Sequence, residues 1–168
     1  MNSLATALLL TSAMVPFAQA QTQQPPTPAK SFSQAFGYVN HKILEMAEDF
    51  PEAKYGFRIA KESRSFQEML IHVASGNIYG AKAGRGEKVN WDEIDPKKYA
   101  TKAETVAALR KSIEDADATL KAVPEERFAK TVEPWLAVIE HAAEHYGQLV
   151  AYYRASGMVP PDSRPKAK

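Results

Sequence analysis

The chain has 168 residues, a formal net charge of +1 and no cysteine. Without cysteine it can form neither disulfides nor thiolate metal ligands, so any metal ion must be bound through nitrogen and oxygen atoms. Lysine and arginine do not cluster along the sequence. The small net charge therefore argues against nucleic acid or an anionic membrane as a partner.

Residues 1–20 resemble a secretory signal peptide. An apolar run over residues 4–17 precedes Ala18-Gln19-Ala20, which matches the small-x-small cleavage pattern, and the run is too short to span a bilayer. Residues 2–20 contain no lysine or arginine, so the usual basic n-region is missing and a truncated or misassigned start is the alternative. The sequence thus predicts a periplasmic or secreted protein with no membrane association after cleavage.

The rest of the chain is predicted to hold one domain. Residues 21–30 are polar and rich in proline, which predicts a disordered spacer. The domain is expected over residues 31–163, and a loose basic tail over residues 164–168. The segment of residues 85–100 has no periodicity and is long enough to cover a site.

Four segments of the domain show apolar residues at helical spacing. Capping-box patterns predict that the first three helices begin at Ser31, Ser65 and Thr101. The fourth is predicted to begin at Pro134, a favoured first helical residue, and to stop at Gly157. No strand pattern or internal repeat is present. The sequence therefore predicts an all-α fold, a four-helix bundle.

Histidines at helical spacing suggest a metal site inside this bundle. The edge of the apolar face of the fourth helix carries a stripe of polar and aromatic side chains: His141, His145, Gln148 and Tyr152. Imidazoles four residues apart on an inward face can bind one metal ion together. His72 on the second helix can supply a third, with room for its ring beside Gly76. Such a set leaves coordination positions for water or substrate, whereas hydrogen-bonded core histidines are the alternative.

Several neighbours of these histidines are further candidates. Residues 141–145 match H-x-x-E-H, the inverted zinc-protease signature, in which Glu144 would be a general base; a solvated carboxylate is the alternative. Gln148 and Tyr152 are candidates for contacts with the metal ligands or with substrate, and core packing is the alternative for Tyr152. His41 lies opposite the apolar face of its helix and is expected at the surface.

Two segments carry a resemblance to a known family: SFQEMLIHVASGN around His72 and EHAAEHYGQLVAYYRASGMVPPDS around His141 and His145. Together with the helix order, they make residues 31–163 similar to the DinB-like (YfiT-type) superfamily. The resemblance implies a four-helix bundle, frequently a homodimer. It also implies a divalent metal bound by these three histidines, often zinc or nickel, with manganese or iron as further options.

The resemblance leaves the reaction open. Members of the superfamily include thiol-dependent S-transferases, an isomerase and proteins assigned as metal-dependent hydrolases. The leading hypothesis is a hydrolase-like metal enzyme acting on a small-molecule substrate. The alternatives are a metal-dependent thiol S-transferase, against which export argues because cytosolic thiols are scarce outside the cytoplasm, and a non-catalytic metal-binding or stress-related protein.

Overall fold

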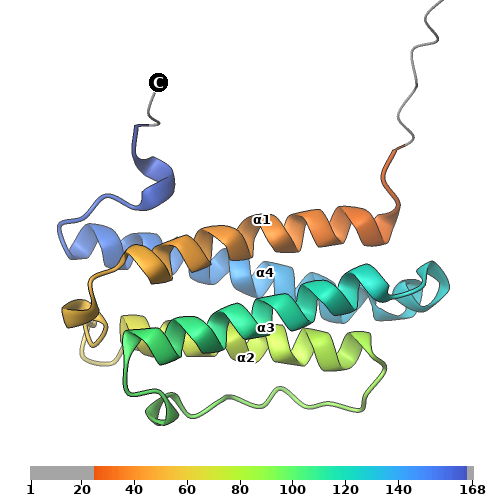
Figure 1. The fold of residues 1–168 in the computed structure, drawn as a ribbon, viewed down its shortest axis with the longest axis horizontal. Helices are drawn as coiled ribbons and strands as arrows, with labels where there is room; N and C mark the ends of the chain where they lie inside the picture. Colours follow the sequence, from red (N-terminus) through yellow and green to blue (C-terminus); the bar gives the residue numbers. More distant parts are fainter. Residues whose placement is uncertain (1–24, 166–168) are drawn as a thin grey trace, which may run out of the picture.

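The computed structural model describes residues 25–165, which form α-helices and no strand (Figure 1). The four helices are α1 (Pro28–Asp49), α2 (Phe66–Gly84), α3 (Lys102–Ala122) and α4 (Glu125–Ala155), and short 3-10 turns lie at Glu52–Lys54, Pro96–Lys98 and Pro161–Ser163. The predicted all-α bundle is confirmed, while the predicted signal peptide lies outside the described residues. Among the described helices, none has the length and apolarity needed to cross a membrane.

The four helices form a square in which α1 and α2 each pack against both α3 and α4. In Figure 1, α1 and α4 run in one direction, and α2 and α3 run in the other. The parallel pairing of α2 with α3 requires the chain to return along the length of the bundle between them, and the segment from residue 85 to residue 101 does this. The antiparallel pairing of α2 with α4 is the one that creates the histidine site.

The first helix begins earlier than the sequence predicted. α1 starts at Pro28, and the Thr27 side chain caps it by accepting a hydrogen bond from the Lys30 amide at 3.3 Å. Ser31 is therefore not a cap: it lies in the first turn, where its hydroxyl donates to the Thr27 carbonyl oxygen at 3.1 Å. A threonine cap followed by a proline at the first helical position competes successfully with the predicted capping box. The last residues of the predicted 21–30 spacer are thus helical.

The fourth helix also begins earlier, at Glu125, so the predicted start at Pro134 is wrong. The helix starts directly after Pro124, whose carbonyl oxygen accepts from the Phe128 amide at 2.7 Å. Pro134 lies inside the helix, where it removes one backbone hydrogen bond. Phe128 and Trp135, on either side of it, are both buried. Their packing outweighs the local cost of the proline and keeps the helix continuous.

The starts of α2 and α3 agree with the sequence. Ser65 and Thr101 each accept a hydrogen bond from the amide three residues on, and the glutamate at that position accepts one from the backbone amide of the cap residue. α4 is followed by Gly157, which has φ +75°, a conformation that favours glycine. The predicted loose tail is anchored at its first residue, because Arg164 Nη1 donates to Asp49 Oδ1 at 2.8 Å.

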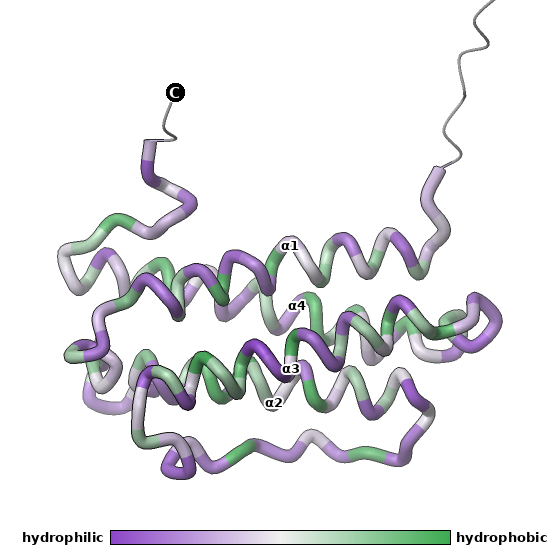
Figure 2. Tube along the Cα trace, in the orientation of Figure 1, coloured by the Kyte–Doolittle hydropathy of each residue, from purple (hydrophilic) through white to green (hydrophobic). Residues whose placement is uncertain are grey.

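Apolar and polar residues alternate along every helix (Figure 2). The buried apolar side chains fill the interior as two clusters. Along α1, α2 and α3, a buried polar residue lies between the two clusters: Asn40, Asn77 and Ser112 respectively. The Asn77 amide donates to Asn40 Oδ1 at 3.1 Å and to Ser112 Oγ at 3.3 Å. These bonds connect α1, α2 and α3 at one level of the bundle. They also provide hydrogen-bond partners for buried amide groups, which are costly to bury without them.

Candidate metal centre

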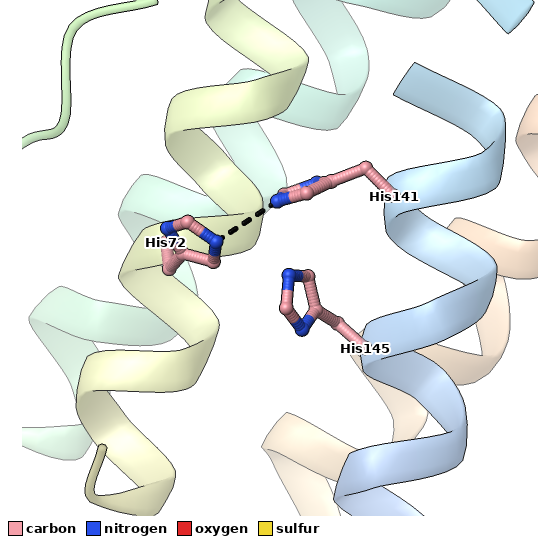
Figure 3. A group of neighbouring side chains, drawn as sticks. All are labelled: His72, His141 and His145. Atoms are coloured by element: carbon pink, nitrogen blue, oxygen red, sulfur yellow. Dashed lines mark hydrogen bonds between the residues drawn. The ribbon is translucent and has the colours of Figure 1, made fainter. Parts of the chain in front are cut away.

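Three histidines from two helices meet between α2 and α4. His72 projects from α2 towards His141 and His145, which lie one turn apart on α4 (Figure 3). Each histidine offers one ring nitrogen, and these three nitrogens all lie within 4.8 Å of one another. The Nε2 atoms of His72 and His141 are 3.0 Å apart, and the ring centroids of His141 and His145 are 4.3 Å apart. The structure thus brings together the three residues that the sequence singled out.

The local sequence fixes the direction of each ring. The capping box at Ser65 sets where α2 begins, and therefore which residues of α2 face α4. On α4, Val138, Ala142 and Leu149 are fully buried and hold the helix face that carries both histidines against the core. The i, i+4 spacing then places the two α4 imidazoles side by side.

Gly76 makes room for His141, not for His72 as the sequence analysis expected. A Cβ atom at Gly76 would lie 2.8 Å from His141 Nδ1 and 3.0 Å from Trp91 Cη2, closer than real side-chain contacts allow. Trp91, from the loop after α2, packs edge-on against His141 with ring centroids 4.8 Å apart. Because Gly76 has no side chain, His141 of α4 and Trp91 of the loop can both pack closely against this face of α2.

The outer nitrogens of two rings are held by hydrogen bonds. His72 Nδ1 lies 3.1 Å from Glu93 Oε1, and His145 Nδ1 lies 3.0 Å from Gln148 Oε1. Because a carboxylate and an amide oxygen only accept, each Nδ1 must carry the proton, which leaves each Nε2 with a free lone pair. In metal-binding histidines, a hydrogen bond from the ring nitrogen that does not bind the metal fixes the tautomer and the orientation of the ring.

Glu93 is the functional candidate that the sequence analysis missed. It lies in the aperiodic loop after α2, where no spacing rule connects it to the histidines. The backbone of this loop is attached to α2 by the Ile94 amide, which donates to Ser75 Oγ at 3.0 Å. Glu93 also pairs with Arg64, whose Nη2 lies 3.1 Å from Oε1 and 3.3 Å from Oε2. The length of the loop was the one available signal, since it predicted a segment able to cover a site.

The environment keeps the imidazoles of His72 and His141 neutral. Burial lowers the pKa of His72, and the positive charges of Arg64 and His145 lower it further, against an opposing effect of Glu93. Burial also lowers the pKa of His141, to about 3, with contributions from the two other histidines and Arg64. Metal ions bind the unprotonated ring nitrogen, so these two side chains are in the binding form near neutral pH.

The sequence of residues 35–150, which includes all three histidines, matches the model of the DinB superfamily. This match extends over more than half of the chain. The chain belongs to the DinB superfamily. Among curated proteins, none matches it.

The other candidates from the sequence take different places in this DinB-superfamily fold. Gln148 contacts His145 as described, and its Nε2 lies 3.4 Å from the exposed Glu144. The buried Tyr152 donates its hydroxyl proton to the Arg64 carbonyl oxygen and packs against aromatic rings of the core. His41 is exposed on α1, with its ring nitrogen 3.3 Å from Glu45. The three-histidine cluster includes neither Glu144 nor His41.

The donor set of this DinB-superfamily site fits a divalent transition metal. Two ring nitrogens with lone pairs cannot approach to 3.0 Å, as His72 and His141 do, unless a proton or a cation lies between them. Two nitrogens bound to a tetrahedral zinc ion lie about 3.3 Å apart, given zinc–nitrogen bonds of about 2.0–2.1 Å. The observed separations, 3.0 Å for one pair and at most 4.8 Å for all, bracket that value. Imidazole suits zinc, nickel, copper and iron alike.

Proposed function

We propose that this protein binds one divalent metal ion through His72, His141 and His145 and uses it in a hydrolase-like reaction on a small molecule. The observation that carries the proposal is the convergence of three imidazoles, two of them neutralised by burial, with the outer nitrogens of two rings already hydrogen-bonded. A site built only to satisfy core histidines does not need three rings aimed at one point.

Three protein ligands suit catalysis because they leave coordination positions for water or substrate. When bound, the metal would supply Lewis acidity, which lowers the pKa of a bound water or polarises a substrate oxygen. The protein contributes the arrangement around it. Glu93 and Gln148 orient two of the imidazoles, and the Trp91 ring covers His141 on the side of α2.

Metal content tests the first part of the proposal. Apo-protein incubated in turn with zinc, nickel and manganese, then desalted, should retain about one ion per chain of at least one metal by elemental analysis. His145→Ala should lose this ion, because it removes one of three ligands. His41→Ala is the matched control, since it removes an exposed histidine of α1, and it should retain the ion. Wild-type protein that retains none of the three metals would refute the proposal.

Activity tests the second part. A panel of ester and amide substrates should show metal-dependent hydrolysis in wild type and in His41→Ala, and none in His145→Ala. The same panel of electrophiles with added thiols separates hydrolysis from thiol transfer, in which the metal would bind the thiol as a thiolate. A metal that raises the melting temperature strongly, with no turnover and no exchangeable ligand, would indicate a non-catalytic metal-binding protein instead.

We also propose that the protein is exported. The support is the apolar run over residues 4–17 with the cleavage pattern at Ala18-Gln19-Ala20. N-terminal sequencing of the mature protein from its native host should begin at Gln21. A mature chain that begins at Met1, recovered from the cytoplasmic fraction, would contradict export.

A further inference from the structure

A cavity of about 600 Å³ adjoins the metal centre at the end where α2 begins and α4 ends. Its walls come from the segment of residues 59–64 and from the facing sides of α2 and α4, and they include Ile59, Arg64, Met69, Gln148, Ala151 and Tyr152. Cavities of about 300–1,000 Å³ hold small organic ligands, so this space has the size of a substrate site.

Two of the wall residues connect the cavity to the histidines. Gln148 accepts a hydrogen bond from His145 Nδ1, and Arg64 pairs with the carboxylate that holds His72 Nδ1. The cavity is therefore linked to His145 through Gln148, and to His72 through the Arg64–Glu93 pair, while no histidine lines its wall.

We propose that this cavity is the substrate site and that it binds a small organic anion, with an apolar body in the cavity and its carboxylate on Arg64. The inference rests on the proposed metal-dependent function, because it names the class of substrate that this function would act on.

The charges around the site favour an anion. An imidazole ligand carries no negative charge, so a divalent ion bound by histidines alone keeps its full charge. The charges of Arg64 and Glu93 offset each other within their ion pair. The cavity wall contains one further carboxylate, on the exposed Glu62. An anionic ligand is therefore expected to direct its carboxylate towards Arg64 and the metal and its apolar end away from them.

Arg64 has donors available for such a ligand. Glu93 occupies only Nη2 of the guanidinium, and within residues 25–165 the Nη1 and Nε groups have no hydrogen-bond partner. A guanidinium carries five N–H donors in a planar fork, so one arginine can hold a protein carboxylate on one edge and a ligand carboxylate on another. The Arg64 backbone is fixed by the hydroxyl of Tyr152, which donates to its carbonyl oxygen.

The remaining walls fit an apolar body. Met69 and Tyr152 are buried core residues that present apolar surface to the cavity, and Ile59 closes it from the opposite segment while 47% exposed. An isoleucine that remains half exposed in the free protein gains burial when an apolar ligand fills the space beside it. That burial contributes roughly 25 cal/mol for each Å² of apolar surface removed from water.

The test uses the full mature chain loaded with zinc and two probes of the same shape, phenylbutyrate and its neutral amide, phenylbutyramide. Isotope-labelled protein titrated with phenylbutyrate should show shifts in the Gln148 side-chain amide and in Arg64 Nε–H. Arg64→Gln should weaken phenylbutyrate binding by about 10-fold or more while leaving phenylbutyramide unchanged, because only the charge-assisted bond is lost. Lys61→Gln, which removes an exposed charge from the same segment, is the matched control and should bind both probes as wild type does.

A second variant tests the cavity itself. Ala151→Trp, at an exposed position of α4, should fill the cavity and abolish binding of both probes. Zinc content is measured in every sample. Phenylbutyrate binding that Arg64→Gln and Ala151→Trp leave unchanged, or its absence from zinc-loaded wild type, would overturn the cavity assignment while the metal proposal stands. Conversely, binding that follows the predicted pattern in protein that retains no zinc would support the cavity and refute the metal function.

Discussion

Replacing Gly76 with alanine is the sharpest test of the metal centre, because it adds one methyl group at the point where three segments meet. Its Cβ would lie 2.8 Å from His141 Nδ1, whereas ordinary contacts begin at 3.4 Å. The imidazole must therefore move by 3.4 − 2.8 = 0.6 Å, and Trp91 by 3.4 − 3.0 = 0.4 Å. Metal ligands need to stay within about 0.5 Å of their binding geometry, so this displacement exceeds the tolerance.

The expected result of Gly76→Ala is a loss of metal affinity in a protein that still folds. A misplaced ligand lowers affinity by about 10- to 100-fold, which corresponds to about 1.4–2.8 kcal/mol. For folding, alanine gains about 0.5–1 kcal/mol over glycine in a helix, whereas overpacking costs about 1–3 kcal/mol. The two effects oppose each other, so we expect the free energy of unfolding of the metal-free protein to change by about 2.5 kcal/mol or less.

The assay is titration of metal-free protein with zinc in competition with a chelator, after circular dichroism has shown that each variant is folded. Gly147→Ala is the matched control: it also places alanine in a helix, on α4, but its Cβ meets nothing within 4 Å. The control should bind zinc as wild type does. Equal zinc affinity in Gly76→Ala and wild type would refute the reasoning, because His141 would then tolerate displacement and could not be a ligand in this position.

Three further predictions follow from the same structure. Glu93→Gln should lower zinc affinity by about 10-fold in chelator competition, since His72 Nδ1 loses its charged partner; unchanged affinity would contradict this role. Gly84→Ala should lower the free energy of unfolding by about 1–3 kcal/mol in urea without changing zinc affinity, because its Cβ would lie 2.6 Å from the buried Trp135 ring. The metal-free protein should lose stability as the pH falls from 7 to 5. In the unfolded chain His72 and His141 take up protons near pH 6.5, whereas their lowered pKa values keep them unprotonated in the folded protein. His141→Gln should reduce this slope in urea titrations at the two pH values, and an unchanged slope would contradict the shift.

Local signals in the sequence were enough to predict the bundle and the three histidines. The capping boxes at Ser65 and Thr101 are contained within four residues each, and the i, i+4 pair on α4 needs only the helical repeat. The start of α1 was wrong because the local Thr27–Pro28 signal was overlooked, whereas the start of α4 was wrong because tertiary packing decides it. The apolar contacts of Phe128 and Trp135 keep α4 helical through Pro134, and no local rule contains that information.

The surroundings of the histidines could not be predicted for a related reason. Glu93 and Trp91 reach the site from a segment without periodicity, and their positions depend on the path of the chain between two parallel helices. The role of Gly76 was assigned to the wrong histidine because a helical wheel shows which residues share a face but not which ring of a facing helix fills a gap. Contacts between α2 and α4 exist only after all four helices have packed.

The return of the chain between α2 and α3 links the fold to the chemistry of the site. A short hairpin there would make α2 and α3 antiparallel, and no segment would then return along the length of the bundle. In this fold the returning segment carries Glu93, whose Oε1 lies 3.1 Å from His72 Nδ1. The long connection brings the Glu93 carboxylate to a site whose proposed metal ligands are all histidines, and that carboxylate also pairs with Arg64. Glu93 thereby holds His72, a proposed metal ligand, in position. It also balances the positive charge of Arg64, which we propose binds the carboxylate of the substrate. Metal binding and anion binding should therefore depend on each other through Glu93.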